Sequence, residues 1–483
     1  MMSMHHTTAR GGSRRAAGHG RGLHVRSHGG MWLAIALLMA GCSLDGLLGA
    51  DELPRDVTDP AMIRTPEGAL RAYHGALAAF RDAFGGEGGE GGNFTAITGL
   101  LSDELTYVGG PADVDPNVDR RDLPEGVDNG AVADVYSRLQ RVRGQASQAI
   151  ALLTRFGPDS IAPLTAHMYA VQAYAEIFLA DLFCSGIPLS TLDYDGDFTY
   201  KPGSTTEEVY QHALVLLDSA LALAGDSVRM QHLARVGRAR ALLALGRFAD
   251  AATSVREVPD EFRYEVSYRA PDNSAGGRRS TNFARLSDLG GELIEHWGVS
   301  VSDREGMTGL DFVSSGDPRT RTSALISGVR QIHHPSKYAT DGSSPIVLAS
   351  GIEARLAEAE AALWAGDIEA WLGKLNHLRR RMWTTIRPPV DGPLPDLTDP
   401  GTEAERVDLL FRERAFWLFL TGQRQGDLRR LLRHYGRTQA QIYPIGAYPS
   451  GEEMSYGSHV DAPVPPAERL TNPRYTGCIS RGA

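Results

Sequence analysis

The chain has 483 residues and a formal net charge of -10 at pH 7, and 42% of its residues are hydrophobic against 22% that are charged. This balance is ordinary for a folded globular protein and excludes a largely disordered chain. The length allows up to about three domains. An acidic chain without a basic, aromatic-rich stripe is repelled by phosphate backbones, so we expect no nucleic-acid partner.

The first 41 residues resemble a bacterial export signal. They carry five arginines and no acid, and residues 31–40 read MWLAIALLMA. This apolar run is too short to span a bilayer but suits the core of a signal peptide. Cys42 follows a small residue directly, as in the lipobox of bacterial lipoproteins, which implies that Cys42 is diacylated. The alternative is an ordinary signal peptide with an incidental cysteine.

Three parts of the chain follow from this interpretation. We expect residues 1–41 to be a signal peptide with a lipobox and residues 42–60 to be a lipidated linker. Residues 61–483 then form a single domain. Two acyl chains anchor a protein to a membrane far more stably than one chain does.

Cys184 and Cys478 are the cysteines that remain if lipidation consumes Cys42. No CxxC or Cys/His spacing indicates a metal site, so we expect neither a metal nor another cofactor. Disulfides persist in the compartments that exported proteins reach. We therefore predict a bond between Cys184 and Cys478, with two separate buried thiols as the alternative.

Helices begin early in the predicted domain. Thr65, Pro66 and Glu67 are typical of a helix start, with a cap, a proline at the first position and an acid in the first turn. Gly85 and Gly86 end this helix, whose apolar stripe recurs at spacings of three and four. Further amphipathic stretches predict helices over 131–155 and 161–183.

Two later segments resemble the turns of tetratricopeptide-like helix pairs. Ser204 and Thr205, followed by Glu207 and Glu208, form a capping box that opens a helix ending at Gly225. After a helix over 230–245, residues 245–251 read LGRFADA, and residues 363–367 read LWAGD between two more amphipathic helices. A regular array would repeat every ~34 residues. We therefore expect scattered helix pairs with long insertions.

We predict one long final helix over 403–433, with Val407, Leu410, Phe411, Leu418 and Phe419 facing inward. Few helical signals occur in four intervening segments, which are 103–130, 186–203, 255–350 and 436–483. Loops of this length in a compact domain are usually functional or disordered, and their aromatic residues favour ordered, functional loops here. Short hairpins are expected within 255–350.

Four separated segments and the tail resemble the SusD/RagB family, in that family's order. In this chain the segments read AVQAYAEIFLADLFCSGIPLS (170–190), STTEEVYQHALVLLDSALALA (204–224), ARLAEAEAALWAGDIEAWLGKLNHLRRR (354–381), ERAFWLFLTGQRQGDLRR (413–430) and APVPPAERLTNP (462–473). No single motif is specific, whereas the ordered set is. The first segment departs from the family pattern, because Cys-Ser-Gly replaces the usual Gly-Asp.

The resemblance implies a mainly α, SusD-like fold. Tetratricopeptide-like helix pairs would form its scaffold, and loop-rich insertions at about 85–130 and 255–350 would form the ligand face. The family implies a non-enzymatic outer-membrane lipoprotein exposed on the cell surface. Such a protein captures a glycan or another nutrient and delivers it to a SusC-like TonB-dependent barrel.

Glycan capture requires exposed aromatic faces on ordered loops. Tyr107 lies in the first insertion, and Trp297 and Phe312 lie in the second. These regions correspond roughly to where the family places its binding aromatics. The three residues are therefore candidate ligand-binding residues, and packing within the core or the loops is the alternative for each.

Clusters of charged residues have two interpretations each. Arg120 and Arg121 either hydrogen-bond sugar hydroxyls or form a solvated ion-pair cluster with their acidic neighbours. Three carboxylates either bind calcium or form a solvated acidic turn, namely Asp193, Asp195 and Asp197. We interpret three further residues as structural, with buried hydrogen bonds that fix their helix, namely Arg424, Asp427 and Arg429.

Two other classes of function remain open from the sequence. One is a lipid-anchored helical-repeat scaffold that binds a protein partner. The other is a surface glycosidase, because two catalytic carboxylates need not be close in sequence. A glycosidase would release reducing sugar from a polysaccharide, and a scaffold would lack clustered exposed aromatics.

Overall fold

The structure, a computed structural model, describes ten ranges of the chain: 63–86, 93–107, 115–158, 161–193, 197–268, 297–299, 309–327, 330–339, 343–448 and 454–482. The predicted signal peptide, Cys42 and the linker lie outside these ranges. Pro60–Ala483 forms one compact unit. Among the described residues, no helix has the length and apolar character needed to cross a membrane.

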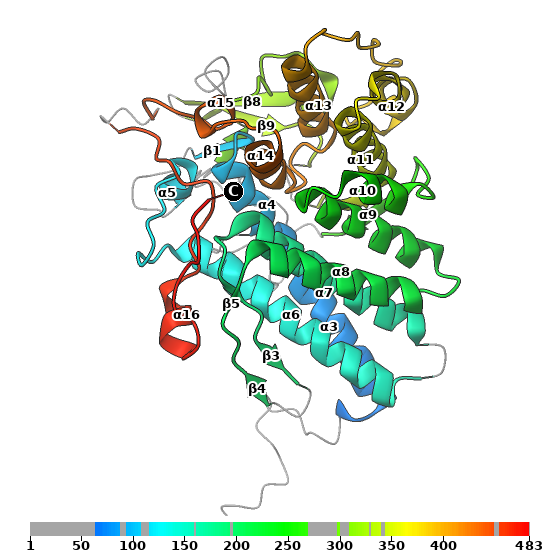
Figure 1. The fold of residues 1–483 in the computed structure, drawn as a ribbon, viewed down its shortest axis with the longest axis vertical. Coiled ribbons are helices and arrows are strands. Elements are labelled where there is room, and N and C mark those ends of the chain that lie inside the picture. Colours follow the sequence, from blue (N-terminus) through cyan, green and yellow to red (C-terminus); the bar gives the residue numbers. More distant parts are fainter. Residues whose placement is uncertain are drawn as a thin grey trace, which may run out of the picture. The chain divides into compact units, whose positions relative to one another are not determined.

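Helices dominate the described chain, so the predicted mainly α class is confirmed. The scaffold helices are α3 (Pro66–Gly85), α6 (Gly130–Phe156), α7 (Ala162–Leu182), α8 (Thr206–Leu223), α9 (Val228–Ala244), α10 (Phe248–Val255), α11 (Gly351–Trp364) and α12 (Ile368–Arg381). From α3 to α12, each of these helices packs against the next (Figure 1). The two insertions interrupt this series in sequence, the first between α3 and α6 and the second between α10 and α11.

The predicted helix starts are confirmed by their caps. The Thr65 hydroxyl accepts a hydrogen bond from the backbone N–H of Gly68 at 3.0 Å, so α3 begins where the sequence indicates. At the start of α8, Thr205 and Glu208 form both hydrogen bonds of a capping box. Each cap pairs backbone N–H groups that the first turn of a helix leaves without partners.

The two tetratricopeptide-like turns have the same backbone geometry. Gly246 follows α9 with φ 72°, and Gly366 follows α11 with φ 77°. After each glycine a backbone N–H reaches back five residues, from Arg247 to the Leu242 carbonyl at 2.8 Å and from Asp367 to the Ala362 carbonyl at 2.9 Å. Glycine adopts this left-handed conformation at little cost, so it ends both helices at the same point.

A short buried helix that the sequence analysis missed completes the core. This is α4 (Phe94–Leu101), which begins after the cap residue Asn93. Phe94 stacks on Phe178 of α7 with ring centroids 4.0 Å apart, and Phe84 of α3 also stacks on Phe178, at 5.4 Å. All eight residues of α4 are buried. It therefore lacks the polar face on which periodicity depends.

The predicted final helix over 403–433 is wrong in one respect, because the structure divides it. The two helices are α13 (Glu403–Trp417) and α14 (Arg424–His434), joined by residues 418–423, here called the 418–423 turn. Leu420 has φ 50° and Gly422 has φ 77°, which no continuous helix accommodates. The residues predicted to face inward are buried: Val407, Leu410, Phe411, Leu418 and Phe419.

The described strands form short antiparallel pairs. The pairs are β1 (Leu105–Tyr107) with β7 (Trp297–Val299), β6 (Arg263–Val266) with β10 (Ile346–Ser350), β8 (Thr322–Ser327) with β9 (Arg330–Pro335), β2 (Ile187–Pro188) with β5 (Gly203–Ser204), and β3 (Thr191–Leu192) with β4 (Phe198–Thr199). The hairpin expected within 255–350 is β8 with β9. Short helical turns complete the chain: α5 (Asp115–Asp119), η3 (Pro318–Thr320), η4 (Met382–Thr385), α15 (Gln439–Ile442) and α16 (Pro466–Thr471).

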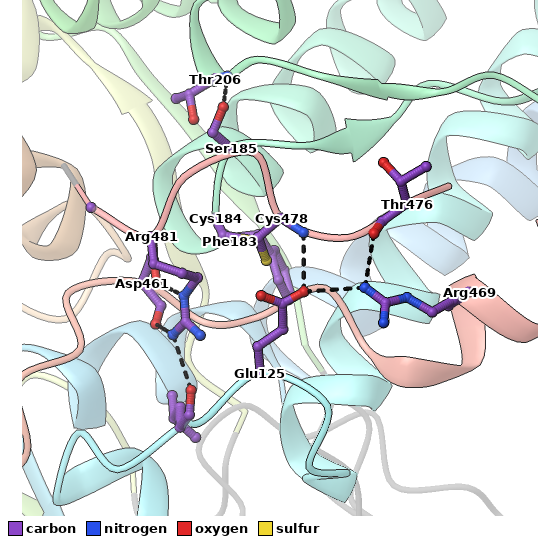
Figure 2. Close-up of a disulfide and its surroundings, with 12 residues drawn as sticks. Glu125, Phe183, Cys184, Ser185, Thr206, Asp461, Arg469, Thr476, Cys478 and Arg481 are labelled. Atoms are coloured by element: carbon purple, nitrogen blue, oxygen red, sulfur yellow. Dashed lines mark hydrogen bonds and ion pairs between the residues drawn. A yellow bond between two sulfur atoms is a disulfide. The ribbon is translucent and has the colours of Figure 1, made fainter. Parts of the chain in front are cut away.

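A disulfide joins Cys184, just after α7, to Cys478 in the C-terminal tail (Figure 2). The Cα atoms are 5.9 Å apart, and the cysteines are separated by 294 residues in sequence. The backbone N–H of Ile479 donates to the Ser185 carbonyl at 2.7 Å. Glu125 accepts from the Cys478 N–H at 3.2 Å, so the loop before α6 also holds the tail.

We expect loss of this disulfide to destabilise the domain. The double variant Cys184→Ser with Cys478→Ser should lower the free energy of unfolding by about 2–4 kcal/mol, because the bond closes a very long loop in the unfolded chain. Urea unfolding followed by circular dichroism measures the change. Wild type in excess reductant is the control and should match the variant; equal unfolding midpoints for oxidised wild type and the variant would contradict the expectation.

Candidate functional site

The two long insertions meet in the ladder of β1 and β7. In its register Leu105 lies opposite Val299, and Tyr107 lies opposite Trp297. Tyr107 and Trp297 are two of the three residues predicted to bind ligand, and they are 190 positions apart in sequence. The structure therefore brings these two positions together. Strand β7 also packs against β9, so the β8–β9 hairpin belongs to the same region.

A buried carboxylate, Asp119 at the end of α5, organises this region. One of its oxygens accepts hydrogen bonds from the Tyr107 backbone N–H at 2.8 Å, the Thr106 hydroxyl at 3.3 Å and the Tyr448 hydroxyl at 2.8 Å. Tyr448 meets Tyr456 edge to face, with ring centroids 5.2 Å apart. We call β1, β7, Asp119 and the Tyr448–Tyr456 pair the ladder surface. Tyr107 and Tyr456 are each half-buried, so both remain accessible in part.

The adjacent arginines have different environments. Arg120 forms an ion pair with Asp122 at 2.8 Å, as the sequence analysis expected of a surface cluster. Arg121 is only 2% exposed, donates to the Pro444 carbonyl at 2.8 Å and lies 5.0 Å from the centre of the Tyr443 ring. Both interpretations from the sequence are wrong for Arg121. Its buried side chain instead holds the C-terminal segment against the first insertion.

Phe312 does not lie on the ladder surface. It is 1% exposed and stacks on Phe419 with ring centroids 5.1 Å apart. Its backbone carbonyl accepts a hydrogen bond from the Thr320 hydroxyl at 2.8 Å. The surface position that the sequence predicted for Phe312 is therefore wrong. An aromatic residue in a long insertion can equally pack inward, and here it seals the second insertion against the 418–423 turn.

Two consecutive acids anchor the first insertion just before β1. Asp103 receives two hydrogen bonds from Arg424, at 2.7 and 2.8 Å, and both side chains are buried. Glu104 accepts the backbone N–H of Leu420 at 2.7 Å. Burial raises the pKa of Glu104 to about 8, so this carboxyl group is largely protonated and neutral at pH 7. The structural role predicted for Arg424 is confirmed.

The second insertion is anchored at the same turn. Lys337 donates to the Phe419 carbonyl, and the Tyr338 hydroxyl donates to the Leu420 carbonyl at 2.8 Å. Burial lowers the pKa of Lys337 to about 7, although Glu104 nearby acts in the opposite direction. In a continuous helix the backbone groups of residues 418–423 would be paired internally. In the 418–423 turn some of them instead form the hydrogen bonds that hold both insertions.

Asp427 and Arg429 also have the structural roles predicted for them. Asp427 receives two hydrogen bonds from Arg414, both at 2.9 Å, and pairs with Arg430 at 3.0 Å. Burial alone would raise the pKa of Asp427, but the charges of these two arginines outweigh it and hold the pKa below its ordinary value. Arg429 donates to three carbonyls at the end of α7, including that of Ala180 at 2.6 Å.

The possible calcium turn has no support among the described residues. Asp193 and Asp197 are exposed, and the Asp197 backbone N–H donates to the Asp193 carboxylate at 2.9 Å. Asp195 lies outside the described ranges. Within those ranges, no group of three or more His, Cys, Asp or Glu side chains could hold a metal ion.

Comparison with known proteins identifies the fold. No family model and no curated protein match the sequence. Among solved structures, a SusD-like carbohydrate binding protein from Bacteroides vulgatus superposes with a TM-score of 0.61 at 15% identity, covering 85% of this chain and 97% of that one. The chain has the SusD-like fold. A laminarin binding SusD-like protein gives a TM-score of 0.62 at 13% identity, over 86% of this chain and 99% of that one.

A SusD superfamily protein from Parabacteroides distasonis gives a TM-score of 0.63 at 14% identity, covering 85% of this chain and 98% of that one. The SusD-like fold predicted from ordered sequence segments is thus confirmed across most of the chain. At these identities the likeness concerns the arrangement of the backbone. The ladder surface therefore has to be evaluated from its own residues.

The buried Glu104 should make stability depend on pH. The folded SusD-like domain keeps the proton up to a pKa of about 8, whereas an ordinary glutamate releases it near 4.5. The stabilisation is therefore complete below pH 4.5 and is lost as pH rises to 8, by up to about 5 kcal/mol. Glu104→Gln cannot ionise and still accepts the Leu420 N–H. We expect this variant to gain stability relative to wild type between pH 5 and pH 8.

Urea unfolding at pH 5, 6.5 and 8 measures this difference. Glu207→Gln, which changes an exposed glutamate in α8, is the matched control and should follow wild type at every pH. If the stability difference between Glu104→Gln and wild type were the same at pH 5 and pH 8, the pKa of Glu104 would not be raised in the folded state.

Proposed function

We propose that this chain is a non-enzymatic carbohydrate-binding protein whose ligand surface is the ladder surface. The observation that carries the proposal is the pairing of Tyr107 with Trp297, two aromatic positions from separate insertions, on a fold shared with carbohydrate-binding proteins. Aromatic faces pack against the CH groups of sugar rings, while nearby polar groups bind hydroxyls.

The surroundings of the ladder suit a preorganised binding surface. Asp119 fixes both β1 and Tyr448 through hydrogen bonds at 2.8 Å, and it is itself 1% exposed. Ligand binding to such a surface would not have to order the backbone of β1 first, which reduces the entropic cost of association. Asp103 and Glu104, anchored directly before β1, add to this rigidity.

The wider role in our proposal is nutrient uptake at the outer membrane. Cys42 would carry the lipid anchor, and a SusC-like TonB-dependent barrel would receive the captured ligand. A pull-down of the lipidated protein from native outer membranes tests this part separately. Co-purification of such a barrel is the expected result, whereas recovery of the lipoprotein alone, from membranes in which related pairs survive, would favour the scaffold alternative.

Affinity electrophoresis against a panel of polysaccharides that includes laminarin tests carbohydrate binding. For a glycan that the wild type retards, we expect Tyr107→Ala and Trp297→Ala each to weaken binding by roughly 5- to 150-fold, since loss of one stacking contact costs about 1–3 kcal/mol. Isothermal titration with a matching oligosaccharide quantifies the change in Kd.

The matched control is Phe198→Ala. Phe198 is 52% exposed on β4, away from the ladder surface (Figure 1), so its loss should leave the Kd unchanged. Equal weakening by all three variants, or no weakening by either ladder variant, would argue against this location of the site. Release of reducing sugar from any of the polysaccharides would instead favour the glycosidase alternative.

A further inference from the structure

A small pocket lies beside the 418–423 turn, apart from the residues of the ladder surface. Its volume is about 120 Å³, and its walls come from β6, β10, the η4 region and the end of α13. Pockets that enclose a drug-sized ligand measure roughly 300–1,000 Å³. This pocket therefore admits a small molecule or one functional group of a larger one.

The charges that line the pocket are unbalanced. Four of the lining residues are cations, namely Arg263, Arg319, Lys337 and Arg387, whereas Asp260 is the single acid among them. Asp260 is already engaged, because it accepts a hydrogen bond from His377 at 2.5 Å and lies 3.7 Å from Arg355. The acid within the pocket therefore does not neutralise its cations.

Two of the four cations have carboxylate partners elsewhere. Arg319 pairs with Glu413 at 2.6 Å and with Asp317 at 2.7 Å, and its side chain is 2% exposed. Arg263 pairs with Glu265 at 2.6 Å within β6. These two charges are compensated without a ligand.

Lys337 and Arg387 make their hydrogen bonds to carbonyls instead. Lys337 donates to the Phe419 carbonyl, and Arg387 donates to those of Thr384 and Ile386 at 2.8 and 2.9 Å. Within the described ranges neither side chain forms an ion pair. The carboxyl group that acts on the pKa of Lys337 is that of Glu104. Its own pKa of about 8 leaves it mostly neutral at pH 7. Burial lowers the pKa of Lys337 to about 7, so its charged form predominates below pH 7, and a bound anion would favour that form further. At pH 6.5 both side chains can therefore pair with an anion.

The pocket wall also includes Trp417, whose buried indole Nε1 has no hydrogen-bond acceptor among the described residues. A buried N–H without an acceptor costs about 1–3 kcal/mol. Oxygen atoms of a carboxylate accept from ammonium, guanidinium and indole N–H groups alike.

We propose that this pocket binds a carboxylate group, which Lys337 and Arg387 recognise. The group comes either from a free organic acid or from the uronate unit of a glycan, because both present the same chemistry. The pocket goes beyond the proposed carbohydrate function, since binding of a free acid does not require the ladder surface.

Isothermal titration at pH 6.5 with D-galacturonate, tri-galacturonate and D-galactose tests the proposal. We expect galacturonate to bind at least about 10-fold more tightly than galactose, since a hydrogen bond to a charged group contributes about 1.5–3 kcal/mol. Lys337→Met and Arg387→Gln should each weaken galacturonate binding by about 10-fold. Tighter binding of tri-galacturonate than of the monomer would identify a glycan as the source, and equal binding would identify a free acid.

Arg256→Gln is the matched control, because Arg256 is exposed and lies outside the pocket. The Kd of this variant for galacturonate should equal that of wild type. Arg387 is also exposed, so its variant remains informative if Lys337→Met fails to fold. Absence of galacturonate binding, equal affinity for galactose, or an unchanged Kd in Arg387→Gln would overturn the proposal. The preference for galacturonate over galactose separates this site from the ladder surface, because aromatic faces pack against the CH groups that both sugars share.

Discussion

Buried pairs between arginine and carboxylate on α13 and α14 determine the arrangement of this fold. Arg424 of α14 binds Asp103 of the first insertion, and Glu413 of α13 binds Arg319 of the second, each pair through two hydrogen bonds of 2.6–2.8 Å. Removing one partner of such a pair would leave a buried charge uncompensated, at a cost of about 3–5 kcal/mol. This penalty makes alternative placements of the insertions unfavourable. Two helices to which neither insertion is adjacent in sequence, α13 and α14, therefore hold both insertions on the scaffold.

The 418–423 turn contributes in a different way, through its backbone. Because the chain leaves helical geometry at Leu420, with φ 50°, its N–H and carbonyl groups are free to bind Glu104 and Tyr338. A non-glycine residue in this conformation costs of order 1–3 kcal/mol, and such strain persists where surrounding contacts determine it. The break is thus the physical connection between the scaffold and the ladder surface. It also forms one wall of the small cationic pocket, so both proposed binding sites depend on the same turn.

Local signals in the sequence were sufficient to predict the scaffold but not the site. The cap at Thr65 and the turn at Gly366 depend on neighbouring residues alone, so they could be identified without a structure. The pairing of Tyr107 with Trp297 depends on contacts between distant segments, which periodicity cannot report. Phe312 illustrates the same limit. Like Tyr107 and Trp297 it is an aromatic residue in a long insertion, yet its ring is buried. Thr421-Gly422 is the one local feature that indicates the break between α13 and α14, since glycine often ends a helix. The apolar residues just before it favoured a continuous helix instead.

Hydrogen exchange on Arg424→Met tests most directly whether the arginine pairs hold the ladder surface in place. Mass spectrometry of wild type and variant would compare the amides of residues 103–107 with those of α8, which packs against α7 and α9. The account predicts faster exchange in 103–107 and unchanged exchange in α8, since the variant releases the first insertion from α14 and leaves the scaffold intact. Unchanged exchange in 103–107, or an equal increase throughout α8, would contradict it.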